Sequence, residues 1–141
     1  MNDEKSLDVK ENFNIVKEEF KKLIKDFSKD LLTTFPELEG RLDISLTTDE
    51  VSDEVLLKYY EYISDNFPEK FFDILYKNDN LFDNLETPLY LLPDIDFKHL
   101  WDCNITDKTR ETIWKYLQLI LFMVTKNSNN ANMFGDTAKL F

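Results

Sequence analysis

Residues 7–33 read LDVKENFNIVKEEFKKLIKDFSKDLLT, and this stretch indicates the fold class. Its apolar side chains recur every three or four positions, the spacing that places them on one face of an α-helix. These residues are Phe13, Val16, Phe20, Leu23, Phe27 and Leu31. Pro36 disfavours helical geometry at the residue before it, so the helix is expected to end near Thr33. The pattern predicts a long amphipathic helix with one buried face.

Two further segments repeat this spacing. Residues 50–65 are expected to form a second helix after a cap at Thr48 or Asp49, and residues 107–126 a C-terminal helix capped by Thr106. The second helix buries Val51, Val55, Leu56, Tyr59, Tyr62 and Ile63, and the C-terminal helix buries Ile113, Trp114, Leu117, Ile120, Leu121 and Val124. Further apolar side chains, Leu119, Phe122 and Met123, surround the rest of the C-terminal helix, which predicts that it is central and packed on more than one side.

Shorter helical segments are expected between these helices. Pro36 and Pro68 each suit the first turn of a helix, which predicts short helices over residues 36–40 and 68–76. Apolar spacing also predicts a helical turn around residues 81–85, and a short helix containing Phe97, Leu100 and Trp101 is expected after a cap at Asp94 or Asp96.

The predicted fold class is all-α. Residues 89–93, which read LYLLP, lie among prolines and are typical of an extended or turn segment rather than a strand paired within a sheet. We therefore predict a compact bundle of five to six helices around a central C-terminal helix, forming one domain over residues 1–126. Residues 127–141 are interpreted as a polar linker followed by the start of another helix, so the chain is expected to continue beyond Phe141.

Composition excludes several classes of protein. The 141 residues include only two glycines, so the glycine-rich turns of Rossmann and Walker nucleotide sites are excluded. A single cysteine allows no disulfide within the chain. The most apolar run, residues 117–124, is far shorter than the roughly 20 residues that cross a bilayer, so no membrane association is expected.

The charge is strongly acidic, with a net value of −11 at pH 7. Direct binding to nucleic acid is not expected, because no basic face is evident. Residues 42–69 hold eight acidic side chains against Lys58 alone. A solvated helix face that keeps the protein soluble is the simpler explanation, and a docking surface for a basic partner protein is the alternative. The candidate residues are Asp49, Glu50, Asp53, Glu54 and Glu61.

A second candidate partner site is apolar. Residues 91–101 form a proline-punctuated segment followed by a short helix, an arrangement that often lies on the surface of a bundle without burying itself fully. Plain core packing is the alternative. The candidate residues are Leu91, Pro93, Ile95, Phe97 and Trp101.

Residues with catalytic or metal-binding chemistry are sparse. His99 and Cys103 lie one helical turn apart, which is compatible with a nucleophilic pair or with two ligands of a metal. Two ligands are too few for structural zinc, and no oxyanion-hole loop accompanies them. The acidic residues between 73 and 86 lack the glycine that an EF-hand loop requires. We assign no catalytic residue, no metal ligand and no cofactor.

Five segments resemble an uncharacterised helical protein family of giant (nucleocytoplasmic large) DNA viruses. The segments are FPEL at 35–38, FFDILY at 71–76, LPDIDF at 92–97, TRETIWKYLQ at 109–118 and FGDTAKLF at 134–141. Members of that family often carry glycine at the position of Asp94 and continue beyond the position of Phe141. The resemblance implies a viral protein of infected cells and brings no catalytic residues with it.

The expected function is therefore a non-enzymatic protein-protein interaction or scaffold module, acting in the host cytoplasm at the viral factory or in the virion. The alternative is an acidic decoy that imitates nucleic acid and occupies a basic host or viral protein.

Overall fold

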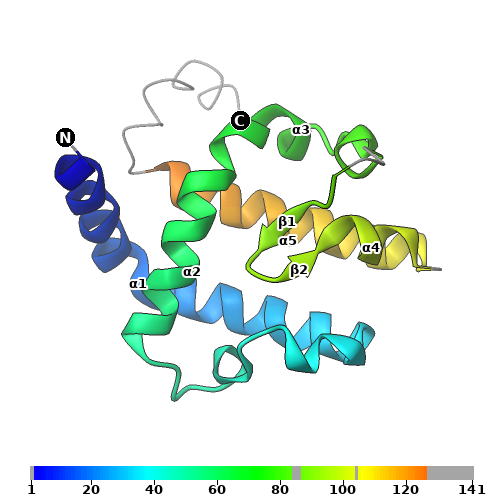
Figure 1. The fold of residues 1–141 in the computed structure, drawn as a ribbon, viewed down its shortest axis with the longest axis horizontal. Helices are drawn as coiled ribbons and strands as arrows, with labels where there is room; N and C mark the ends of the chain where they lie inside the picture. The colour runs from blue at the N-terminus through cyan, green and yellow to red at the C-terminus, as the bar shows by residue number, and fades with distance from the viewer. Residues whose placement is uncertain (1, 84–86, 104, 127–141) are drawn as a thin grey trace.

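The computed structural model describes residues 2–83, 87–103 and 105–126, with the backbone alone for residues 2–8 and 126. Most of the described chain is helical, which confirms the coarser part of the all-α prediction (Figure 1). The α-helices are α1 (Asn2–Thr34), α2 (Asp53–Asn66), α3 (Phe71–Leu75), α4 (Phe97–Asp102) and α5 (Asp107–Lys126). Short 3-10 helices lie between them: η1 (Pro36–Gly40), η2 (Ile44–Thr47), η3 (Pro68–Lys70) and η4 (Asp79–Phe82).

Helix α1 buries the face that its sequence spacing predicts. Phe13, Val16, Phe20, Phe27 and Leu31 are all buried, whereas Leu23 is only partly buried and the neighbouring Ile24 is fully enclosed. The helix ends at Thr34, after which the amide of Phe35 donates to the carbonyl of Leu31 at 2.7 Å and Pro36 opens η1. The burial of Phe35 and Leu38 holds η1 against the core.

Aromatic contacts join α1 to the two other long helices. Phe20 packs edge-on against Tyr60 of α2, with ring centroids 5.3 Å apart. Phe27 stacks on Tyr116 of α5 at 4.7 Å. A separate cluster around Trp101 stacks this ring on Phe82 at 3.9 Å and sets it edge-on to Trp114 of α5. These contacts connect the N-terminal and C-terminal halves in one core.

Helix α5 contacts α1, α2 and α3 but is not enclosed on all sides. Its side chains Leu119 and Phe122 are 45% and 37% exposed, so the helix packs against several elements but the prediction that it is central to the bundle is wrong. The neighbouring elements α3 and α4 are only five and six residues long and are too short to cover the whole length of α5.

The prediction of a purely helical fold is also wrong, because residues 90–96 form a two-stranded antiparallel sheet. Strand β1 (Tyr90–Leu92) pairs with β2 (Ile95–Asp96), placing Tyr90 opposite Asp96 and Leu92 opposite Ile95, with an irregularity between the two pairs. The prolines do not prevent this pairing, since Pro88 precedes β1 and Pro93 lies in the turn. Proline followed by a residue with positive φ is the pattern of a type II turn, and Asp94 has a φ of 65°.

Capping side chains define where the helices begin. Helix α2 begins at Asp53 with Ser52 as its cap, later than the predicted Thr48 or Asp49, because the Ser52 hydroxyl accepts from the amide of Val55 at 3.2 Å. Asp96 caps α4, and the hydroxyl of Thr106 accepts from the amide of Thr109, as the sequence predicts. The prediction for residues 127–141 lies outside the described residues.

The turn between the strands gives a stability prediction. Asp94 is exposed and has a left-handed φ of 65°, which glycine adopts without steric strain. Asp94→Gly is expected to raise the free energy of unfolding by about 0.5 kcal/mol, and Asp94→Val to lower it by about 1 to 2 kcal/mol. Urea denaturation of both variants beside the parent protein measures the difference. If Asp94→Val were more stable than Asp94→Gly, residue 94 would not hold this left-handed conformation in solution.

Candidate functional site

The predicted acidic residues lie on the loop before α2 and along its first three turns. We call Asp49, Glu50, Asp53, Glu54 and Glu61 the acidic surface. The first four are exposed and Glu61 is half-buried. Lys58 is exposed between Glu54 and Glu61 on the helix, so the negative charge is most concentrated at the N-terminal end of α2.

Two of these carboxylates are paired with lysines of α1. The Nζ atom of Lys25 lies 2.6 Å from Oδ1 of Asp49, and that of Lys17 lies 2.7 Å from Oδ2 of Asp53. The hydrogen bond from Lys25 lowers the pKa of Asp49 below its ordinary value, and the bond to Asp53 raises the pKa of Lys17. Both pairs are solvated, so each contributes little to the stability of the fold.

The three glutamates of the acidic surface have no such partners in the described part of the chain. These glutamates are Glu50, Glu54 and Glu61. The helix beneath them is anchored by the buried side chains of Leu56, Tyr60 and Ile63. The carboxylates of Glu50, on the loop, and Glu54, on this packed helix, are therefore open to solvent, where they can meet cationic groups of another molecule.

Most residues of the predicted apolar site are buried in the core instead of lying on the surface. Leu91, Ile95 and Phe97 are 0% exposed and Trp101 is 7% exposed, while Pro93 is half-buried. The expectation that this segment does not bury itself fully is therefore wrong. The hairpin and α4 fold onto the core, and Oδ1 of Asp96 fixes their junction by accepting from the amides of Leu89 and Lys98 at 2.9 and 3.0 Å. In this conformation the segment offers a partner little apolar surface.

A polar groove adjoins the same hairpin, and sequence analysis did not indicate it. It has a volume of about 560 Å³ and lies between α2, α3 and β1. The hydroxyl of Tyr62 donates to the carbonyl of Tyr90 at 2.6 Å along this groove. Its charged lining is mixed, with Glu69 and Asp73 beside Lys70 and Lys98, so it favours neither sign of ligand. No sequence pattern marks it, because its walls come from separate elements.

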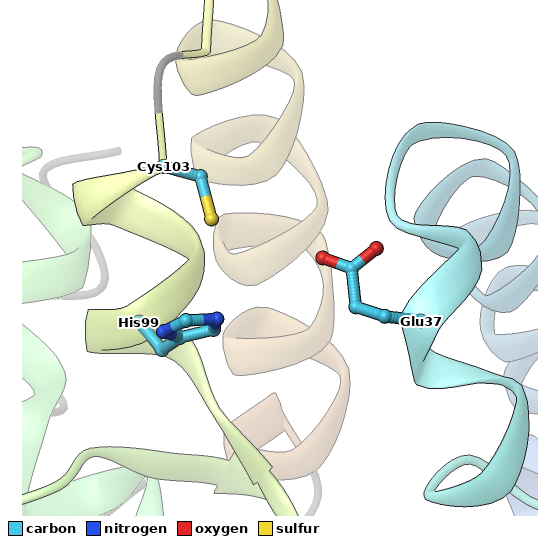
Figure 2. Close-up of side chains that lie close together, drawn as sticks. All are labelled: Glu37, His99 and Cys103. Atoms are coloured by element: carbon cyan, nitrogen blue, oxygen red, sulfur yellow. The ribbon is translucent and has the colours of Figure 1, made fainter.

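The structure brings His99 and Cys103 together, as their spacing predicts, and adds Glu37 of η1 beside them (Figure 2). Cys103 lies at the carboxyl end of α4 and is half-buried, whereas His99 on the same helix is exposed.

Comparison with models of known protein families, with curated proteins and with solved structures finds no match. Among the described residues, no helix combines the length and apolar character that crossing a membrane requires.

Proposed function

We propose that the protein is a non-enzymatic interaction module that binds a basic partner protein through the acidic surface. The observation that carries this proposal is that exposed Glu50 and Glu54 and half-buried Glu61 form no ion pairs within the described chain, next to two aspartates paired with lysines. A net charge of −11 extends the negative potential around this surface. Such a field attracts basic proteins over distances of about 10 Å at moderate salt.

The arrangement favours recognition of a cationic side chain over chemistry. A glutamate carboxylate accepts two parallel hydrogen bonds from an arginine guanidinium, which makes arginine the best-matched partner side chain. The buried side chains of Leu46 and Val51 anchor the loop before α2, so little ordering accompanies binding. Solvated carboxylates at the rim of an interface mainly raise the association rate and are sensitive to salt.

The resemblance to the giant-virus family supports a proposal about where in the cell the protein acts. We propose that the module acts in the cytoplasm of an infected cell, at the viral factory, or within the virion.

Affinity capture at two salt concentrations tests the proposed function. The tagged protein is incubated with extract of host cells at about 0.05 M and 0.5 M salt, and the bound proteins are identified by mass spectrometry. We expect basic proteins that are retained at low salt and released at high salt. Recovery of no partner, or of partners that resist high salt, would contradict binding through the acidic surface.

Competition with DNA distinguishes the proposed interaction module from the alternative, a decoy that imitates nucleic acid. Excess duplex DNA added to the captured complex displaces a partner whose nucleic-acid site is occupied by the acidic surface. We expect retention of the partner, because a scaffold contact leaves that site free. Displacement by DNA would overturn the scaffold assignment in favour of the decoy.

A further inference from the structure

Three side chains that commonly bind zinc meet between η1 and α4. The ligand atoms of Glu37, His99 and Cys103 all lie within 4.8 Å of one another. Figure 2 shows the Cys103 sulfur, the His99 ring and the Glu37 carboxylate turned toward a common space. Glu37 and His99 are exposed and Cys103 is half-buried, so an ion reaches this space directly from solvent.

The backbone fixes two of these ligands on one side of α4. The amide of Cys103 donates to the carbonyl of His99 at 3.1 Å and closes the last turn of the helix, so the two side chains lie one above the other. Buried Phe97, Leu100 and Trp101 hold α4 in the core. The imidazole and the thiol are therefore carried by an element that cannot move freely.

The third ligand comes from a different part of the chain. Glu37 lies in the first turn of η1, between the buried side chains of Phe35 and Leu38. Pro36 restricts the backbone at the start of this turn, and only the exposed glutamate side chain is free to rotate. The carboxylate can thus adjust its position while η1 stays packed.

We propose that Glu37, His99 and Cys103 bind one Zn²⁺ ion. Imidazole and thiolate ligands select zinc over calcium or magnesium, which prefer oxygen. Ligand atoms on a tetrahedral zinc ion lie about 3.3 to 3.6 Å apart, given bond lengths of about 2.0 to 2.3 Å. Separations of at most 4.8 Å therefore need to contract by no more than about 1.2 to 1.5 Å, which rotations of the three side chains can supply.

The proposed site has two physical consequences. Three protein ligands leave the fourth position of zinc to water or to a side chain from a partner. The ion also links η1 to α4 across a long stretch of sequence, so binding to the folded state raises its stability.

Cobalt and zinc binding to the full chain test this proposal. The reduced protein is titrated with Co²⁺, followed by absorbance, and with Zn²⁺, followed by calorimetry and thermal unfolding. We expect one ion per chain, a thiolate-to-cobalt charge-transfer band, and a rise in Tm of about 5 to 9 °C when zinc exceeds its Kd about hundredfold.

Variants of the three ligands and one matched control complete the test. His99→Ala and Cys103→Ser are expected to weaken zinc binding more than tenfold, with loss of the charge-transfer band in Cys103→Ser, and Glu37→Gln to weaken it about tenfold. Glu39→Gln removes an exposed carboxylate from the same η1 helix and is expected to bind zinc as the parent does. Circular dichroism of each variant without metal verifies its fold.

Several results would overturn the site. Absence of zinc binding in the parent protein would do so directly. Binding that survives all three ligand substitutions would show that surface carboxylates hold the ion. An unchanged affinity in Glu37→Gln would remove the link between η1 and α4.

Discussion

Phe20→Ala is expected to lower the free energy of unfolding by about 3 to 5 kcal/mol. The ring of Phe20 is 0% exposed and packs edge-on against Phe13 at 6.5 Å and Tyr60 at 5.3 Å, where α1 meets α2. Truncation removes these aromatic contacts and leaves a cavity that the packed helices cannot collapse to fill. Urea denaturation followed by circular dichroism measures the loss.

Ile15→Ala is the matched control for this prediction. Ile15 lies on the same helix but is 70% exposed, so its truncation is expected to change stability by less than about 0.5 kcal/mol. Comparable losses in the two variants would mean that α1 does not present the described face to the core.

Stability is expected to decline between pH 10 and 12 because tyrosines are buried in their neutral form. Burial raises the pKa of Tyr60 from 10.0 to about 12, against a smaller lowering effect of its hydrogen bond with Ser64. Below pH 10 the phenol keeps its proton in both states. Between pH 10 and 12 the unfolded state loses the proton while the folded state keeps it, so stability falls by about 1 kcal/mol per pH unit from this group.

Other tyrosines strengthen this alkaline loss. Burial also raises the pKa values of Tyr59, Tyr62 and Tyr116, and for Tyr116 the hydrogen bond to Asp30 at 2.6 Å acts in the same direction. The decline is therefore expected to exceed that of a single phenol.

Tyr60→Phe isolates the contribution of one group. Urea denaturation at about pH 9, 10 and 11 is expected to show a weaker pH dependence in this variant than in the parent protein. Equal slopes in the two proteins would show that Tyr60 ionises at its ordinary pKa and is not buried as described.

The long helices were predictable from sequence because their apolar spacing is sustained over many turns. Phe13, Val16, Phe20, Phe27 and Leu31 are all buried as expected. A repeat that long has one consistent structural interpretation, since packing of an amphipathic face is what stabilises a helix in a protein.

The hairpin was not predictable in the same way. Strands of three and two residues are too short for an alternating pattern, and the pairing depends on a turn at Asp94 and on hydrogen bonds to Asp96. The same limit applies to Leu119 and Phe122, because their apolar character does not specify whether neighbouring elements are long enough to cover them.

In the candidate sites, too, some features could be predicted from the sequence and others depend on tertiary packing. Exposure of Asp49, Glu50, Asp53 and Glu54 agrees with their position in a charged segment, but their pairing with Lys17 and Lys25 depends on how α1 packs beside the loop. The spacing of His99 and Cys103 is local and visible in the sequence. Glu37 joins them only through tertiary packing, and no local pattern distinguishes it from other exposed glutamates.

The role of the acidic surface is tested most directly by comparing two variants. One loses three carboxylates from the acidic surface, and the other loses three carboxylates from a different part of the molecule. The variant Glu50→Gln/Glu54→Gln/Glu61→Gln neutralises three carboxylates that form no described ion pair. The control Glu11→Gln/Glu18→Gln/Glu19→Gln removes the same charge from exposed positions on α1. Both variants keep the Lys17 and Lys25 pairs, so the fold beneath the surface is retained.

The affinity of each variant for the partner recovered by capture is then measured by calorimetry at several salt concentrations. We predict that the acidic-surface variant binds at least about tenfold more weakly and with a shallower salt dependence, while the control stays within about twofold of the parent protein. Equal affinities in all three proteins, or equal losses in both variants, would contradict a specific role of the acidic surface.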